Sequence, residues 1–282
     1  MSDLFDFGTR QQQYAVMGNP VAHSQSPRIH MLFAAQTGEP VQYSAIQVDP
    51  GGFEQAVGNF QANGGKGLNI TIPFKREAWA LVDERSERAA RAGAVNTIKF
   101  ENGHLLGDNT DGVGLVNDLL QNHAIGIKAR RILLMGAGGA ARGVLAPLLE
   151  QQPERLLIAN RTADTAHTLA QSFADLGHVQ GSGYAQLAGQ EFDLIINATA
   201  ASLQGDVPPL PDGIITANGQ CYDMMYSAQP TAFMRWAESQ GAATVLDGLG
   251  MLVGQAAESF YIWRGVRPDA KPVIATLRAE MA

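Results

Sequence analysis

The feature that most constrains the fold is the stretch from Arg130 to Arg142, which reads RRILLMGAGGAAR. Its apolar run, residues 132–135, is typical of a buried parallel strand, and the glycines that follow complete the pattern G-x-G-x-x-A. In such a pattern the first glycine allows a tight turn, the second lets the backbone approach a pyrophosphate, and the small third residue lets helix and strand pack closely. The helix N-terminus then faces the phosphates with unpaired N–H groups and a partial positive charge. The stretch therefore predicts a strand, a turn and a helix that together bind a dinucleotide.

The next strand indicates which dinucleotide. Glycine turns also join strands to helices in proteins that bind no ligand, so context is needed. Residues 155–159 form a second apolar run, which ends in Asn160-Arg161-Thr162. An acidic residue at this position would bind the free 2′-hydroxyl of the adenosine ribose, whereas the planar guanidinium of Arg161 suits a 2′-phosphate. The sequence thus favours NADP over NAD, with a plain surface arginine as the alternative.

Composition and charge narrow the class of protein. The chain has 282 residues, enough for two domains with separate cores, and a net charge of −7, so we expect no nucleic-acid partner. No apolar run approaches the roughly 18 residues of a membrane span, and the N-terminus lacks the pattern of a signal peptide, so we expect a cytoplasmic protein with no membrane partner. Cys221 is the only cysteine, which excludes an intrachain disulfide and a multi-cysteine metal site. We expect no metal, and the oligomeric state stays open, a homodimer included.

The N-terminal part begins with polar residues that we expect to be loose, followed by a strand at residues 14–17. After it, residues 18–27 form a loop rich in hydroxyl groups, and Pro27 opens a helix predicted over residues 28–37. Ser24 and Ser26 precede this helix. They are either helix-capping residues or ligand-binding hydroxyls, and the pattern alone does not separate the two.

The segment GLNITIPFK, residues 67–75, alternates apolar and polar side chains, which places Asn69 and Thr71 on one face of a strand. Asn69, Thr71 and Lys75 would then converge at the strand end, where open α/β sheets place their ligands. The alternative is that all three simply face solvent.

Further polar residues follow at the ends of predicted elements. A helix through Trp79 and Val82 is expected to have Glu87 near its end. Asn96 lies among apolar neighbours and needs hydrogen-bond partners, from the backbone or from a ligand. Asp111 suits the N-cap of the next helix. A lysine and an aspartate in one pocket could also move a proton at a hydroxyl or carbonyl carbon, which hydride transfer to a nicotinamide requires.

From Arg130 onward, predicted strands and helices alternate, which indicates an α/β fold with a parallel sheet. The expected strands are residues 132–135, 155–159, 192–197 and 244–246. The expected helices are residues 140–150, 163–176, 231–240 and one that residues 247–253 open and that contains Gln255, Glu258 and Trp263.

These segments together resemble shikimate dehydrogenase, from Tyr14 to Leu277. The resemblance is carried by motifs in the same order, namely HSQSP, NITIPFK, GAVNT, DNTDG, GAGGAAR with NRT, and YDMMY followed by DGLGMLVGQA. It implies an α/β fold with an N-terminal substrate domain, a Rossmann-type NADP-binding domain and C-terminal helices that return to the first domain. The implied boundaries are residues 1–111 with 247–282 for the substrate domain and residues 112–246 for the cofactor domain.

The resemblance also implies residue roles. Lys75 would be the acid–base residue in the NADPH-dependent reduction of 3-dehydroshikimate to shikimate, a step of aromatic amino acid biosynthesis, and Asp111 would orient the reacting oxygen. The substrate carboxylate would be held by Ser24, Ser26 and Tyr226, and the ring hydroxyls by Thr71, Asn96, Asp111 and Gln255. The implied cofactor-binding residues are Gly136, Ala137, Gly138, Gly139 and Ala140 for the pyrophosphate, Asn160, Arg161, Thr162, Ala163, Asp164 and Thr165 for the 2′-phosphate, and Met224, Gly248 and Met251 for the nicotinamide, with Glu87 as a further member.

One departure from the family is visible after the strand at residues 192–197. Family members often read N-A-T-S-S-G here, whereas this chain reads NATAAS over residues 197–202. The change puts the cofactor contacts at this strand in doubt.

Two alternatives remain at this point. One is a quinate/shikimate dehydrogenase that uses NAD, which Arg161 disfavours. The other is a non-catalytic ligand-binding protein, which has no need of Lys75 and Asp111.

Overall fold

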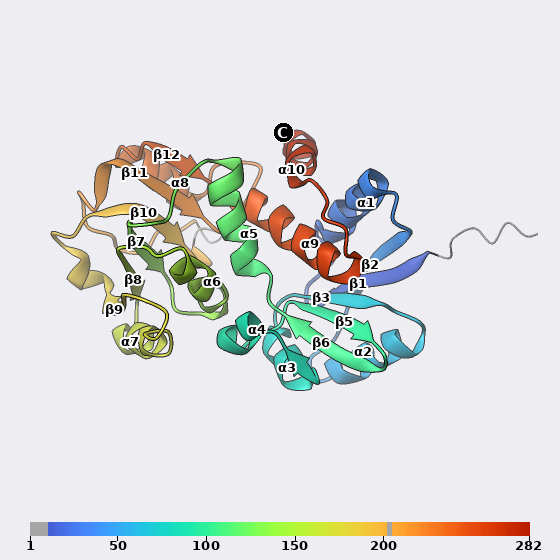
Figure 1. Ribbon diagram of the computed structural model, residues 1–282. Coiled ribbons are helices and arrows are strands. Elements are labelled where there is room, and N and C mark those ends of the chain that lie inside the picture. Colours follow the sequence, from blue (N-terminus) through green and yellow to red (C-terminus); the bar gives the residue numbers. More distant parts are fainter. Residues whose placement is uncertain (1–10, 202–204) are drawn as a thin grey trace, which may run out of the picture. The chain divides into compact units, whose positions relative to one another are not determined.

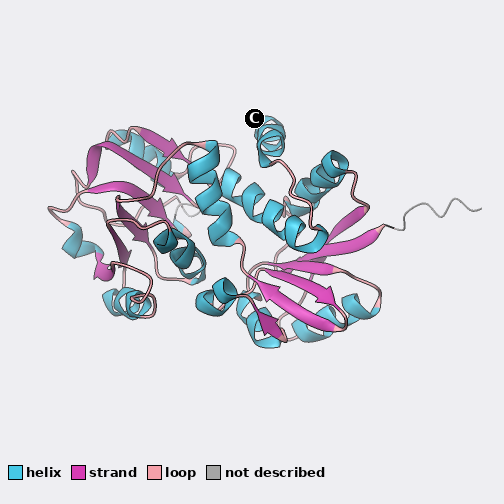
Figure 2. Ribbon diagram, viewed as in Figure 1, coloured by secondary structure: helices cyan, strands magenta, loops and turns pink. Residues whose placement is uncertain are grey.

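The computed structural model describes residues 11–201 and 205–282, and the chain divides into two compact units. The first unit runs to Ala90 and includes Ala94–Thr110 and Ala256–Asp269; the second consists of Arg91–Gly93, Asp111–Gln255 and Ala270–Ala282. Figure 2 shows the strands of each unit gathered into a sheet with helices alongside. The domain boundaries implied by the resemblance stay a prediction. None of the helices in the described part of the chain is long and apolar enough to cross a membrane.

The first unit contains a mixed sheet in the order β2-β1-β3-β5-β6-β4 (Figure 1). Strand β1 is parallel to β2 and β3, whereas β5 is antiparallel to both β3 and β6. The elements are β1 (Gln12–Gly18), α1 (Ser26–Thr37), β2 (Val41–Gln47), α2 (Phe53–Ala62), β3 (Gly67–Ile70), α3 (Lys75–Leu81), β4 (Glu84–Arg85), α4 (Glu87–Ala92), β5 (Thr97–Glu101) and β6 (His104–Asp108).

Both faces of this sheet are covered, because successive strand residues point to opposite sides. Ala15 and Met17 of β1 lie in one apolar core with side chains of α2, α3 and α4. On the other face Tyr14 of β1 stacks on Trp263 with ring centroids 4.7 Å apart, and Phe33 of α1 packs edge-on against Phe260. The second face is thus closed by α1 and by the end of α9 (Leu249–Arg264), which is far away in the sequence.

The second unit contains a six-stranded parallel sheet in the order β12-β11-β10-β7-β8-β9. This is the doubly wound order of Rossmann-type sheets, which confirms the expected fold class. The elements are α5 (Asp111–Asn117) continued by the π-helical turn η1 (Asp118–Asn122), β7 (Arg131–Met135), α6 (Gly139–Glu150), β8 (Arg155–Asn160), α7 (Ala163–Gln171), β9 (Val179–Gly183), the short 3₁₀ helix η2 (Tyr184–Leu187), β10 (Phe192–Asn197), β11 (Ile215–Asp223), α8 (Ala232–Ser239), β12 (Thr244–Leu246) and α10 (Ala270–Met281).

Alternation along the strands also builds two cores in this unit. Ile132 and Leu134 of β7 pack with α5, α6 and α7, whereas Leu133 and Met135 pack with η2 and α8. Because ligands bind outside the carboxyl ends of the strands where the strand order reverses, the fold places a binding crevice after β7 and β10.

Several expectations about local structure are wrong. The strand at the N-terminus begins at Gln12 rather than Tyr14, because it pairs along its whole length with Val41–Gln47. Ser26 is not an N-cap: it is the first residue of α1, and Gln25 precedes it in a helical conformation without a side-chain cap. The residues before position 11, expected to be loose, lie outside the described part of the chain.

The region after β3 also differs from expectation. The strand ends at Ile70, and Ile72 is 67% exposed because the chain turns there. Helix α3 stops at Leu81, since Val82 is extended and leads into β4, which pairs with β6. As a result Glu87 opens α4 instead of ending the preceding helix.

Candidate active site

In the first unit, the expected ligand-binding segments meet at one edge of the sheet. Strands β1 and β3 are parallel, so the loops that follow Gly18 and Ile70 leave from the same edge. The backbone ties these loops together: the Thr71 N–H donates to the Met17 carbonyl at 2.9 Å, and the Asn19 N–H donates to the Ile72 carbonyl at 2.9 Å.

A third segment reaches this edge from the antiparallel strand β5. Asn96 precedes β5, and its carbonyl accepts the Ile70 N–H at 2.8 Å. The Lys75 carbonyl accepts the Val95 N–H at 2.9 Å, which ties the start of α3 to the same segment. The fold therefore gathers the segments that carry Ser24, Ser26, Thr71, Lys75 and Asn96, as expected.

Burial differs among these side chains. Ser26 and Asn96 are 8% and 3% exposed, whereas Ser24, Thr71 and Lys75 are half-buried. The Ser24 hydroxyl accepts the Ser26 N–H at 3.3 Å, so the two serines belong to one turn. Glu87 is exposed at the first turn of α4.

Gly18 allows the loops to approach this closely. A Cβ atom added at Gly18 would lie 2.3 Å from Cγ2 of Thr71 and 3.2 Å from the Ile72 carbonyl oxygen. Only glycine therefore fits at the end of β1 with Thr71 in its present position.

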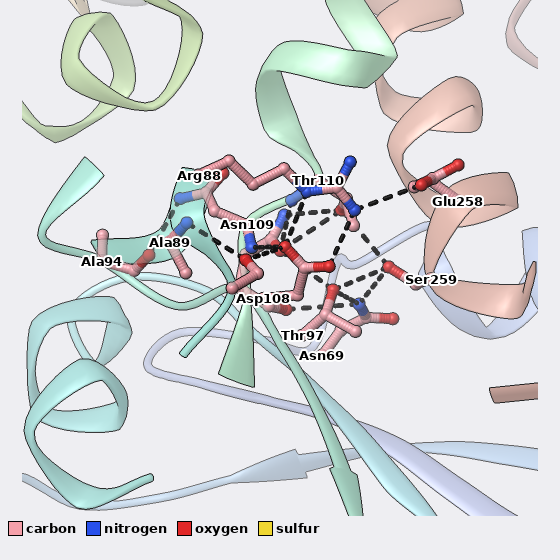
Figure 3. A network of polar contacts seen from close by, with 12 residues as sticks. Asn69, Arg88, Ala89, Ala94, Thr97, Asp108, Asn109, Thr110, Glu258 and Ser259 are labelled. Atoms are coloured by element: carbon pink, nitrogen blue, oxygen red, sulfur yellow. Dashed lines mark hydrogen bonds and ion pairs between the residues drawn. The ribbon is translucent and has the colours of Figure 1, made fainter. Parts of the chain in front are cut away.

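Asn69 lies in the interior instead of facing a ligand, which contradicts its expected convergence with Thr71 and Lys75. Its Oδ1 atom accepts the Tyr43 hydroxyl at 2.8 Å and contacts His30 Nε2 at 3.1 Å. Its Nδ2 atom donates to Ser259 Oγ at 3.0 Å and to Thr97 Oγ1 at 3.2 Å. Asn69 is thus a structural hub (Figure 3), because a buried amide must find partners and here finds them within the protein.

An ionic network holds the DNTDG turn beside this hub. Arg88 makes two hydrogen bonds to the carboxylate of Asp108, at 2.6 and 2.7 Å, and contacts Glu258 at 3.1 Å (Figure 3). Burial alone would lower the pKa of Arg88, but the hydrogen bond and charge of Asp108, with those of Glu258, raise it overall. Asp108 also accepts the Ser86 hydroxyl. Sequence reasoning missed this network, because Arg88 and Glu258 carry no motif and are 170 positions apart.

In the second unit, the glycine turn has the geometry of a phosphate cradle. Gly136 has a φ of 99°, and an added Cβ would lie 3.1 Å from Thr199 Cγ2. Gly138 is the N-cap of α6, and neither it nor Gly139 has any atom within 4 Å of an added Cβ, so the backbone there is open. The first turn of α6 holds no acidic residue, which leaves the helix N-terminus suited to an anion.

A cavity of about 890 Å³ lies beyond this turn, at the ends of β8, β9 and β10. Its lining includes Asn160, Arg161, Thr162 and Ala163 from the NRT segment and Thr199, Ala200 and Ala201 from the segment that departs from the family pattern. Arg161 is the only cationic side chain among the described lining residues, and Asp206 the only anionic one. Ser202, the last residue of that departure, lies outside the described residues.

The same cavity includes residues that the sequence did not indicate. Tyr184 and Gln186 line it from η2, and Pro208 and Pro209 line it from the proline-rich loop. Burial raises the pKa of Tyr184 to about 12, against the charge of Arg161. Strand β9, which places Tyr184, was not predicted because it reads VQGSG and lacks an apolar run.

The expected nicotinamide-side residues also come together. The Gly248 N–H donates to the Met225 carbonyl at 3.0 Å, and an added Cβ at Gly248 would lie 2.2 Å from the Met224 carbonyl oxygen. Met224 and Met251 share one apolar cluster.

The remaining candidates in the second unit are Tyr226, Gln255 and Asp111. Burial and the carboxylate of Asp247 raise the pKa of Tyr226, so its phenol remains a proton donor at neutral pH. Gln255 is half-buried on α9 and donates to the Leu252 carbonyl at 2.8 Å. Asp111 is 8% exposed and is the first residue of α5.

The second unit has a Rossmann-type sheet with an open glycine turn where the strand order reverses, and the first unit is an α/β fold with polar segments at one edge of its sheet. Together these features define a dinucleotide-binding protein with a separate ligand-binding unit. Within this class, the chain belongs to the shikimate dehydrogenase family. The family descriptions "Shikimate dehydrogenase substrate binding domain", "Shikimate / quinate 5-dehydrogenase" and "Shikimate 5'-dehydrogenase C-terminal domain" match residues 16–98, 118–204 and 248–278.

Individual relatives support this membership over nearly the whole chain. A shikimate dehydrogenase (NADP(+)) from Methylococcus capsulatus is 57% identical over 273 residues, which cover 96% of this chain and 98% of the relative. The structure of shikimate 5-dehydrogenase from Thermus thermophilus in complex with NADP(H) and shikimate is similar at a TM-score of 0.85, with 32% identity and 96% and 100% of the two chains covered. An Ael1 enzyme from Pseudomonas putida is similar at a TM-score of 0.89, with 46% identity and 95% and 98% covered. The expected family, fold class, oxidoreductase activity and NADP cofactor are thereby confirmed.

Proposed function

We propose that this chain catalyses the reversible NADPH-dependent reduction of 3-dehydroshikimate to shikimate. The observation that carries the proposal is that segments bearing hydroxyl, amide and ammonium side chains meet at one edge of the first sheet. These side chains belong to Ser24, Ser26, Thr71, Asn96 and Lys75. They match a ligand with one carboxylate and several hydroxyl groups.

In this proposal Ser24, Ser26 and Tyr226 bind the substrate carboxylate, and Thr71, Asn96, Asp111 and Gln255 bind the ring hydroxyls. Hydroxyl, phenol and amide N–H groups donate to a carboxylate without bringing a second full charge into the site. The buried Asn96 amide is suited to recognise a hydroxyl, since a site that hydrogen-bonds such a group rejects analogues lacking it.

Lys75 moves the proton. In the direction of reduction its ammonium donates a proton to the carbonyl oxygen at C3, and in the direction of oxidation its neutral amine accepts the proton of the C3 hydroxyl. Asp111 orients this oxygen and Lys75. The bound cofactor supplies or accepts the hydride.

The cofactor-binding residues fit NADP in shape and charge. The backbone at Gly138 and Gly139, where an added Cβ would meet no atom within 4 Å, suits the pyrophosphate, together with Gly136, Ala137 and Ala140. Arg161 supplies a cation in the cavity at the end of β8, which Asn160, Thr162 and Ala163 also line. Asp164 and Thr165, the next residues along α7, are the further candidates for the adenosine end. Met224, Gly248 and Met251 bind on the nicotinamide side. Glu87 is the remaining residue proposed to bind the cofactor.

A substrate and cofactor matrix tests the proposal. Purified protein is assayed for NAD(P)H formation with shikimate and with quinate, each with NADP and with NAD. We expect turnover to be fastest with shikimate and NADP. Faster turnover of quinate with NAD would identify a quinate/shikimate dehydrogenase. Binding of shikimate without turnover in any of the four combinations would identify a ligand-binding protein.

We further propose that the protein acts in the cytoplasm, where an NADPH-dependent biosynthetic reductase meets its reduced cofactor. Fractionation of the source cells with an antibody to this chain would test this. Light scattering of the purified protein would show whether it is a homodimer.

A further inference from the structure

The orientation of the Asn96 side-chain amide is fixed by an unambiguous donor. The backbone N–H of Thr110 lies 2.9 Å from Asn96 Oδ1, and a backbone N–H can only donate. The atom facing it is therefore the amide oxygen. The Asn96 nitrogen then faces the Thr110 hydroxyl, at 3.0 Å.

This orientation sets the direction of the hydrogen bonds that join Asn96, Thr97 and Ser259. Asn96 Nδ2 donates to Thr110 Oγ1, and Thr97 Oγ1 donates to Asn96 Oδ1 at 2.9 Å. A hydroxyl has one proton, so Thr97 Oγ1 must accept from Ser259 Oγ, 2.8 Å away. The Thr110 hydroxyl proton has two acceptors within reach, Asn96 Oδ1 at 3.2 Å and Ser259 Oγ at 3.3 Å.

The four side chains thus form a closed ring of hydrogen-bond contacts. It runs from the Asn96 amide through Thr110, Ser259 and Thr97 and back to Asn96; Figure 3 shows Thr97, Thr110 and Ser259 converging from β5, the DNTDG turn and α9. Asn69 Nδ2 donates to both Thr97 and Ser259, which supports the same directions.

The three hydroxyl residues of the ring are buried too deeply to touch a ligand. Thr97, Thr110 and Ser259 are each 0% exposed, whereas Asn96 is 3% exposed and lies at the edge of the sheet with the other site segments. Asn96 is therefore the member of the ring whose side chain can meet a ligand.

We propose that this ring positions Asn96 as an obligate hydrogen-bond donor to its ligand, with Thr110 as the principal positioning residue. The Asn96 oxygen already accepts from Thr110 N and Thr97 Oγ1, which occupies both lone pairs. The amide can therefore serve a substrate oxygen only through its N–H group, and that oxygen must accept. Thr110 contributes both its backbone and its hydroxyl to this arrangement. The inference rests on the proposed role of Asn96 in substrate binding.

Isosteric and conservative variants of Thr110 test the inference. Thr110→Val keeps the shape and the backbone bond but removes the hydroxyl, so we expect kcat/KM for shikimate to fall about tenfold, chiefly through KM. Thr110→Ser restores a hydroxyl and should return kcat/KM to within about twofold of the wild type. Ser259→Ala removes the contacts with Thr97 and Thr110 but leaves both bonds to the Asn96 oxygen, so it should have a smaller effect than Thr110→Val. The dissociation constant for NADP, measured by fluorescence titration, should stay unchanged in all three.

Asn96→Ala and the double variant Thr110→Val/Asn96→Ala distinguish positioning from a general effect on folding. If Thr110 acts through Asn96, the double variant has the kcat/KM of Asn96→Ala alone, because the second change has nothing left to position. A further tenfold fall in the double variant would overturn the inference. The inference would also be overturned if Asn96→Ala raised KM for shikimate while Thr110→Val kept the wild-type KM. In that case the proposed function would still stand. If Asn96→Ala itself leaves KM unchanged, Asn96 does not bind substrate, and the inference falls along with that residue assignment.

Discussion

At the residue scale, cofactor choice is assigned to Arg161, the single cation among the described residues of the cavity at the end of β8. A charge-assisted hydrogen bond to a phosphate contributes roughly 1.5–3 kcal/mol, so Arg161→Ala should weaken NADP binding by about one to two orders of magnitude. NAD lacks the 2′-phosphate and should be affected little. Fluorescence titration with each cofactor measures the difference.

The exposed Arg235 of α8 provides a matched control in the same unit, because it lies outside the cavity lining. Arg235→Ala should bind both cofactors as the wild type does. An equal loss for NADP and NAD in Arg161→Ala would show that Arg161 supports the local structure and does not recognise the 2′-phosphate.

Lys75 is the residue on which the proposed proton transfer depends. A positioned acid–base group typically contributes ~10²–10⁴-fold, so Lys75→Ala should lower kcat by about that range while the NADP dissociation constant stays near its wild-type value. Asp111→Asn should also lower kcat. If the two residues act as one unit, the double variant should lose less than the product of the two single losses.

Lys66 is an exposed lysine of the first unit, and Lys66→Ala controls for the loss of a positive charge. It should keep wild-type kcat. A near-normal kcat in folded Lys75→Ala would mean that water or another group moves the proton.

At the element scale, the approach of the loop after β1 to the loop after β3 depends on Gly18. The 2.3 Å gap between an added Cβ and Thr71 Cγ2 leaves no room for alanine, so Gly18→Ala must displace Thr71. Overpacking of this kind costs typically 1–3 kcal/mol of stability, and moving Thr71 should also raise KM for shikimate. Thermal unfolding and steady-state kinetics on one preparation measure both effects.

Gly58 of α2 offers the opposite case, since an added Cβ there meets no atom within 4 Å. Gly58→Ala should stabilise the protein by up to about 1 kcal/mol, because alanine is the better helix former, and should leave KM unchanged. Wild-type stability and KM in Gly18→Ala would show that the two loops do not need this close approach.

The elements also show which parts of the fold a sequence can predict. The buried strands β7, β8 and β10 were predicted to within a residue or two, because their apolar runs lie between glycine, asparagine and charged residues. The hairpin of β5 and β6 was missed, since TIKFE and HLLGD are short and mix charged with apolar residues. Likewise the pattern misplaced Asn69, because period-two alternation shows which face a residue is on and not whether that face is buried. The roles of Thr71 and Lys75 stay predictions.

At the scale of the whole molecule, the interactions that organise the first unit connect distant parts of the sequence. Asn69 bonds to Ser259 across 190 positions, and Arg88 reaches Glu258 across 170. Neither pair has a local signal, because a single sequence shows only neighbours along the chain. Motifs therefore indicated the residues proposed to meet the ligand, whereas the residues that hold them in place emerged only with the fold.

His30 lies in the interior of the first unit, and we expect it to dominate the loss of stability in mild acid. It is fully buried, its ring stacks on Tyr43 at 4.2 Å, and its Nδ1 has no hydrogen-bond partner. Burial lowers the pKa of His30 to about 3, against the opposing effect of its hydrogen bond to Asn69. In the unfolded chain the pKa of histidine is about 6.5, so between these values the unfolded state binds a proton that the folded state does not. Stability is therefore complete above pH of about 6.5 and falls as the pH drops toward 3, by up to about 1.4 kcal/mol per pH unit.

Urea unfolding at pH values of about 6.5 and 4.5 tests this assignment. His30→Gln keeps an N–H donor for Asn69 and cannot titrate, so it should be less stable than the wild type at the higher pH but lose less stability on acidification. His104 has a side chain that is 64% exposed, and His104→Gln should keep the wild-type dependence on pH. The difference in slope between these two variants isolates the proton taken up by His30 on unfolding, independent of any packing defect that the substitution introduces. Equal slopes in His30→Gln and the wild type would show that His30 is protonated in the folded protein or that other groups dominate in this range.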